Sequence, residues 1–167
     1  MKKYYSPLIA LFVCFTSLNA VQAQTKEVPT IKISGELTKP ATFQMNDLQK
    51  MPRTRVMRKD RDGNAHEYDG VLLSDLLTKT GTTIGKDLKG KNLTKFALIE
   101  AGDGYQVIFA LAELDPDFND EKIILADQMD GKMLPAADGP FRIVVENEKK
   151  PARCIKQVRS IKIGFSK

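Results

Sequence analysis

The sequence has 167 residues, a length that suits one compact domain rather than two. Hydrophobic residues make up 42% and charged residues 28%, proportions that are ordinary for a globular protein and exclude a disordered or fibrous chain. With one His and two Cys, the chain has too few ligands for a zinc ribbon, a multi-histidine metal site or a disulfide scaffold.

The first 23 residues have the pattern of a secretory signal peptide. Lys2 and Lys3 precede an apolar run at 8–18, and Val21 and Ala23 form a small-x-small cleavage site. The run is too short to span a bilayer permanently, so we expect cleavage after Ala23 and a soluble periplasmic or secreted protein without a transmembrane segment. The mature charge would be (26 − 2) − 21 = +3, a mild excess that argues against a nucleic-acid partner.

Residues 24–167 are predicted to form a single domain of α+β type that is mostly β. Alternating apolar residues and short apolar runs bounded by turn residues both predict strands. In chain order, the strands are expected at 31–34, 53–59, 65–68, 96–100, 105–109, 123–126, 141–145 and 161–165. Five Asp-Gly pairs, a dipeptide that favours tight reversals, mark turns along the chain.

A few short helical segments interrupt the predicted strands. They are expected at 45–51, 72–77, 110–114 and 151–158. Pro52 ends the first of them. Asp69-Gly70 is expected to break the strand before the second helix, and Gly81 follows that helix at a C-cap position.

Basic residues are the most informative candidates for a binding site. Arg153 and Lys156 are three positions apart and would share a helical face, while Arg142 follows a Gly-Pro pair at the start of a strand. If the turns bring these cations together, their donors form an anion site suited to phosphate or sulfate. Otherwise they are separate solvated charges.

Two other residues each allow a structural and a functional interpretation. Cys154 is the only Cys left after cleavage, and it is either a small core residue or a reactive or metal-ligating thiol. His66 is the only imidazole, and it is either an exposed or hydrogen-bonded strand residue or the base of a catalytic triad.

Several motifs follow one another in a recognisable order. They are Ile31-x-Ile33-x-Gly35-Glu36-Leu37, Tyr68-Asp69-Gly70-Val71-Leu72-Leu73-x-x-Leu76-Leu77, Asp103-Gly104-Tyr105, Leu125-Ala126-Asp127, Asp138-Gly139-Pro140-Phe141-Arg142-Ile143-Val144 and Arg153-x-x-Lys156-Gln157-Val158-x-x-Ile161. In this order, and over nearly all of the mature chain, they resemble the oxidoreductase molybdopterin-binding domain family of the sulfite oxidase type. The resemblance implies a mixed α+β domain with a curled β-sheet.

The resemblance also implies a cofactor and a chemistry. Family members bind molybdopterin, hold its phosphate with basic residues and ligate molybdenum with a Cys thiolate for two-electron oxygen-atom transfer. That Cys lies on the segment before the aromatic-x-Gly-Val element, which here is 53–59 and contains no Cys. Met57 is the nearest soft ligand, but a neutral thioether does not replace an anionic thiolate on an oxidised metal.

We therefore expect an exported, non-catalytic domain that keeps the cofactor scaffold and binds a pterin, another anionic small molecule or a protein partner. The residues expected to line its pocket are Arg55, His66, Tyr105, Arg142, Arg153 and Lys156. One alternative is a molybdopterin-dependent oxidoreductase that acts on a small sulfur or nitrogen compound with an envelope redox partner. The other is an envelope protein-interaction domain.

Overall fold

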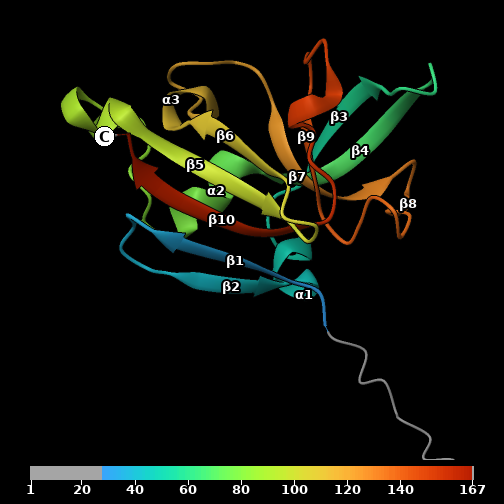
Figure 1. Cartoon of the computed structure of the whole chain (residues 1–167), viewed down its shortest axis with the longest axis horizontal. Helices are drawn as coiled ribbons and strands as arrows, with labels where there is room; N and C mark the ends of the chain where they lie inside the picture. Colours follow the sequence, from blue (N-terminus) through green and yellow to red (C-terminus); the bar gives the residue numbers. More distant parts are fainter. Residues whose placement is uncertain (1–27, 167) are drawn as a thin grey trace, which may run out of the picture.

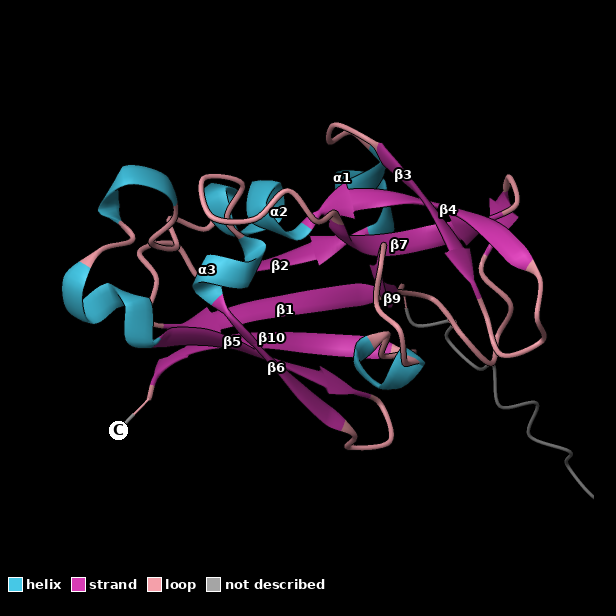
Figure 2. Cartoon of the chain, turned by 90° about the horizontal axis from the view of Figure 1, so that it is seen from above, coloured by secondary structure: helices cyan, strands magenta, loops and turns pink. Residues whose placement is uncertain are grey.

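A computed structural model describes residues 28–166, which form two five-stranded sheets with short helices beside them (Figures 1 and 2). The predicted signal peptide lies outside the described residues. The first sheet has the strand order β2-β1-β10-β5-β6. Its strands are β1 (Thr30–Gly35), β2 (Ala41–Gln44), β5 (Lys95–Ala101), β6 (Gln106–Ala110) and β10 (Val158–Phe165).

The second sheet has the order β3-β4-β7-β8, and β9 also pairs with β7. Its strands are β3 (Thr54–Lys59), β4 (Ala65–Leu72), β7 (Ile123–Met129), β8 (Lys132–Met133) and β9 (Arg142–Val145). All described pairs in this sheet are antiparallel. The first sheet is mixed, because β1 and β10 run parallel while its other pairs are antiparallel.

The helices are short and lie at the ends of strands. The α-helices are α1 (Met45–Gln49), α2 (Leu73–Lys79) and α3 (Leu111–Leu114), and the 3-10 helices are η1 (Gly85–Asp87), η2 (Gly90–Thr94) and η3 (Pro151–Arg153). Within residues 28–166, none of these helices is long and apolar enough to cross a membrane. The predicted α+β class, mostly β with a mixed sheet, is confirmed.

One hydrophobic core joins the two sheets. In the first sheet, the register places Ile33 opposite Ile161 and Ile161 opposite Ile99, and all three side chains are fully buried. Leu125 of β7 and Ile143 of β9 bring the second sheet into the same core. The period-two alternation of these strands therefore places their apolar faces against each other.

Two local predictions are wrong. Asp69-Gly70 does not end its strand, because β4 continues to Leu72 and only a register shift against β7 marks the pair. A Cβ atom at Gly70 would lie 2.3 Å from the carbonyl oxygen of Leu125, so the glycine is needed for close approach of the neighbouring strand. The segment predicted to be helical at 151–158 contains only the single turn η3 before β10 begins.

Candidate functional site

A pocket of about 510 Å³ lies where the two sheets meet. The turn after β3 contributes Asp60 to its wall, and the β5–β6 turn contributes Tyr105. Arg142, at the start of β9, and the segment between η3 and β10 provide the rest. Its lining residues are Asp60, Arg61, Ala101, Asp103, Tyr105, Ala137, Arg142, Pro151, Ala152, Cys154, Ile155, Lys156 and Gln157.

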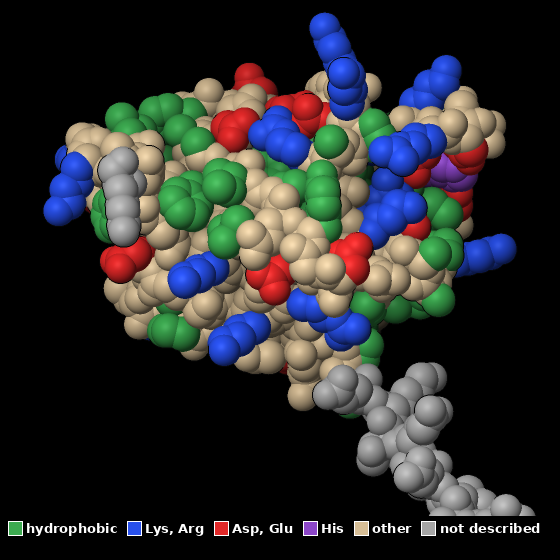
Figure 3. Space-filling view, in the orientation of Figure 1, with side chains coloured by type: hydrophobic (Ala, Val, Ile, Leu, Met, Phe, Trp, Pro, Cys, Tyr) green, Lys and Arg blue, Asp and Glu red, His purple; other side chains and the backbone are tan. Residues whose placement is uncertain are grey.

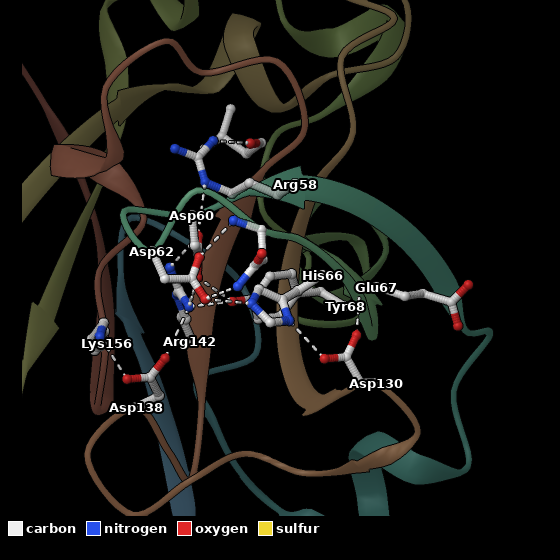
Figure 4. Close-up of polar contacts among 12 residues, drawn as sticks. Arg58, Asp60, Asp62, His66, Glu67, Tyr68, Asp130, Asp138, Arg142 and Lys156 are labelled. Atoms are coloured by element: carbon white, nitrogen blue, oxygen red, sulfur yellow. Dashed lines mark hydrogen bonds and ion pairs between the residues drawn. The ribbon is translucent and has the colours of Figure 1, made fainter.

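Arg142 is the centre of a buried ion network in the wall of this pocket (Figure 4). Its side chain is 2% exposed, and its guanidinium donates two hydrogen bonds to the carboxylate of Asp60 at 3.0 and 3.1 Å. It also donates to Asp138 at 2.9 Å and to the Tyr68 hydroxyl at 2.5 Å. The Tyr68 hydroxyl in turn donates to Asp60 at 2.6 Å, so each carboxylate is held by more than one donor or cation.

Two more cations extend the network. Lys156 Nζ lies 2.6 Å from the second oxygen of Asp138, and Arg58 Nε lies 3.6 Å from Asp60. The side chains come from the β3–β4 hairpin, β9 and the segments on either side of β9, and they converge in the view of Figure 4. A buried network of this kind holds its members in one arrangement, because any unpaired charge would be costly.

The network fixes the protonation states of its members. Burial opposes the charge of Asp60, but hydrogen bonds from Arg142 and Tyr68 outweigh it and hold the pKa of Asp60 below its usual value. Burial, together with the hydrogen bond to Asp60, raises the pKa of Tyr68 well above its usual value. At neutral pH the site therefore contains an ionised carboxylate and a protonated phenol.

A second pocket of about 420 Å³ adjoins the first. The two pockets share Asp60, Arg61 and Pro151, and the second is also lined by Arg58. Asp60 is thus the carboxylate at the junction, with open space on both sides of it.

The structure brings together three of the six residues predicted to line the pocket. Tyr105, Arg142 and Lys156 line it. Arg55 does not, because it lies on the outer side of β3 and pairs with Asp69 at 3.3 Å.

Arg153 is also not among the residues that line the pocket, because the helix that was predicted to carry it together with Lys156 does not form. The helical turn ends at Arg153, so this residue and Lys156 do not share a helical face. Arg153 forms ion pairs with Glu113 and Glu148 at 2.9 and 2.7 Å, while Lys156 turns to Asp138.

His66 belongs to a separate surface cluster at the end of the β3–β4 hairpin. Its Nδ1 lies 2.6 Å from Asp130 and its Nε2 lies 3.0 Å from Asp62. The imidazole is visible between acidic side chains in Figure 3. The hydrogen bond to Asp62, and to a smaller extent the one to Asp130, raises the pKa of His66 to about 9. The ring is therefore protonated at neutral pH and unsuited to act as a general base.

This cluster predicts a pH-dependent contribution of His66 to stability. Because the pKa of His66 rises from 6.5 to about 9 on folding, its contribution is complete below pH 6.5 and is lost as the pH rises through 9. We expect His66→Gln to cost more stability at pH 6 than at pH 9.5, as measured by denaturant unfolding of both proteins. An equal cost at the two pH values would contradict the ion pairs.

Two residues of the site could not be found from the sequence as residues of a pocket. Asp60 follows directly after a predicted strand and looks like part of a hairpin turn, and Asp138 looks like part of an Asp-Gly turn. Both face inward and bind Arg142, which lies 82 residues after Asp60. The sequence did contain one signal, namely Arg142 in a strand of apolar residues. A cation buried in such a strand needs a carboxylate partner.

The sequence matches a model of the oxidoreductase molybdopterin binding domain over residues 18–166. The chain belongs to this family. The resemblance inferred from the ordered motifs is therefore confirmed. A comparison with curated proteins returns no match.

Among solved structures, this member of the molybdopterin-binding family is similar in fold to a chain in the crystal structure of the sulfane dehydrogenase SoxCD from Paracoccus pantotrophus. The TM-score is 0.63 and the sequence identity 22%. The match covers 80% of this chain and 37% of the other one, so the chain spans little more than a third of that protein's length.

The residues present do not fit a molybdenum ion held by a protein thiolate. Met57, on the segment where the family carries its Cys, is 54% exposed on β3, and it is Asp60, directly after that segment, that lines the pocket. Cys154 lines the pocket but is 4% exposed, and burial raises its thiol pKa. In the part of the chain that the structure describes, no three His, Cys, Asp or Glu side chains are grouped to hold a metal.

The phosphate of a pterin cofactor also meets a poor match. Arg142 and Lys156 are the cations suited to it, but both already bind internal carboxylates at hydrogen-bond distance. An incoming phosphate would have to compete with Asp60 and Asp138 for them.

Proposed function

We propose that this protein is a non-catalytic member of the family that binds a small, ring-bearing anionic molecule, such as a metal-free pterin, in the pocket beside Tyr105. The proposal rests on Asp60, which directly follows the segment 53–59 and places a carboxylate in the wall of the pocket. A carboxylate paired with Arg142 offers no soft ligand for molybdenum, whereas the pocket itself remains large enough for a small organic ring.

The pocket offers a surface for a ring and a charge for an anionic group. Tyr105 is half exposed, and its hydroxyl donates to the carbonyl oxygen of Ala152 at 3.1 Å, which holds the phenol ring beside the pocket. Such a ring stacks on an aromatic ligand. Arg61 is exposed and has no carboxylate partner among residues 28–166. Of the cations that line the pocket, it is therefore the one available to bind a negatively charged group of the ligand.

Metal and pterin analysis of the purified full-length product tests this proposal. We expect molybdenum far below one atom per chain by elemental analysis of protein made in a host that synthesises molybdopterin. We also expect an aromatic small molecule to be released on denaturation and detected by fluorescence. Tyr105→Ala should lower its amount, whereas Arg153→Met, outside the pocket, should not. One molybdenum atom per chain would overturn the non-catalytic proposal.

One observation keeps the oxidoreductase alternative in view, namely that Cys154 lines the pocket. In that case the protein would need a redox partner, and Cys154 would have to lose its proton to ligate the metal. Cys154→Ser distinguishes the two functions. Molybdenum that is present in the wild type and lost in this variant would support ligation by Cys154, and molybdenum retained in both would exclude it.

We also propose that the protein acts outside the cytoplasm, on the basis of the signal-peptide pattern before residue 24. N-terminal sequencing of the protein recovered from periplasmic and cytoplasmic fractions tests this. A mature protein beginning at Gln24 in the periplasm or medium is expected, and an uncleaved cytoplasmic chain would contradict it.

A further inference from the structure

The carboxylate of Asp60 lies among three groups that donate a hydrogen bond to it or carry a positive charge beside it. It accepts two hydrogen bonds from Arg142 and one from the Tyr68 hydroxyl, and Arg58 lies 3.6 Å away. Within the described chain, the Nε atoms of Arg58 and Arg142 are both buried and have no hydrogen-bond partner.

Both arginines are held in place independently of Asp60. Arg58 is 4% exposed and donates to the carbonyl oxygens of Val145 and Glu148 at 2.9 and 3.0 Å. Arg142 also binds Asp138 and is fixed in β9. Removing the carboxylate of Asp60 therefore leaves the two guanidinium groups close to their present positions.

We propose that Asp60 fills, from within the chain, an oxyanion site made by Arg142, Arg58 and Tyr68, and that inorganic phosphate or sulfate binds there once this carboxylate is removed. A tetrahedral oxyanion presents more acceptor oxygens than a carboxylate, so it can also bind Arg58 Nε, which lies 3.6 Å from Asp60 without a hydrogen bond. The proposal explains why a phosphate-bearing cofactor meets a poor match here, and it does not depend on which ligand binds beside Tyr105.

The position of Asp60 gives an anion a route to the site. The residue lines both pockets, so truncation of its side chain opens the space between the arginines to solvent on two sides. The backbone of Asp60 keeps its role in the hairpin turn, because its N–H donates to Asn64 and its carbonyl oxygen accepts from Gly63 in any variant. Asp60→Ala therefore changes the charge and the space without removing the turn contacts.

The test is titration of Asp60→Ala with phosphate by calorimetry, at constant ionic strength set with chloride. We expect phosphate to bind this variant at least about tenfold more tightly than it binds the wild type, since charge-assisted hydrogen bonds to buried cations are the strong ones. Sulfate should behave in the same way.

Asp103→Ala is the matched control. Asp103 lines the same pocket and carries the same charge, but its side chain accepts a hydrogen bond from the backbone of Tyr105 and pairs with no arginine among residues 28–166. Asp103→Ala should bind phosphate no better than the wild type. Equal gains in both variants would show a general charge effect and overturn the proposal.

Two further outcomes complete the test. If Asp60→Ala is unfolded in chloride, phosphate should restore its circular dichroism spectrum, and failure to restore it would contradict the site. If it is folded, addition of Arg142→Met to the same protein should abolish the gained affinity. A folded Asp60→Ala that ignores phosphate, or a double variant that still binds it, would overturn the assignment.

Discussion

Arg142→Met is expected to lower the free energy of unfolding by about 3–5 kcal/mol, because it removes one partner of a buried ion network and leaves the others charged. Asp60 would then keep the Tyr68 hydroxyl and Arg58 as partners, and Asp138 would keep Lys156. The free energy follows from urea unfolding of the variant and the wild type at neutral pH.

Arg153→Met is the control for this prediction. Arg153 also pairs with two carboxylates, but its side chain is 34% exposed, and partly solvated pairs contribute about 1 kcal/mol or less. If the two variants lose the same stability, the network around Arg142 is not the buried structural element described above.

Gly70→Ala is expected to cost about 3 kcal/mol, at the upper end of the range for overpacking. The added methyl group would meet the backbone of β7, with the Leu125 oxygen at 2.3 Å and the Ala126 Cα at 2.6 Å. Backbone atoms in a paired strand cannot move aside as a flexible side chain can, so β4 and β7 would have to separate. Thermal or urea unfolding would measure the loss.

Gly102→Ala provides the matched control. Its Cβ would meet the flexible side chain of Arg159 at 3.4 Å, so we expect a change within about 0.5 kcal/mol. A tolerated Gly70→Ala would mean that the β4–β7 pairing is looser than the structure describes.

The strands were predictable where their side chains alternate. Residues 31–34 and 161–165 carry apolar residues at every second position, and both lie in strands, β1 and β10. Short edge elements were not predicted, because β2 and β8 have no buried residue and so no apolar face to detect. The predicted helix at 151–158 ends early because Cys154 already leaves the helical region, with a ψ of 65°. Gln157 then adopts a positive φ of 52° without being Gly or Asn, which no composition rule anticipates.

The site was predictable in two of its cations and not in its anions. Arg142 and Lys156 were expected to meet, and they do, through Asp138. Their pairing partners come from turns, where Asp is common for local hydrogen-bonding reasons, so an inward-facing Asp60 looks in the sequence like any other turn residue. Only the strand order shows that the β3–β4 turn lies against β9, which explains why the sequence suggested a free anion site and the structure shows a filled one.

The parallel pairing of β1 with β10 also determines when this domain can form during synthesis. Ile33 and Ile161 face each other although 161 − 33 = 128 positions separate them, and β10 lies between β1 and β5. Until the last strand has left the ribosome, the first sheet exists only as two separate hairpins, β1–β2 and β5–β6, each with an exposed apolar face. Assembly of the first sheet therefore has to wait for the synthesis of β10, and the apolar faces of the earlier hairpins stay open to aggregation until then.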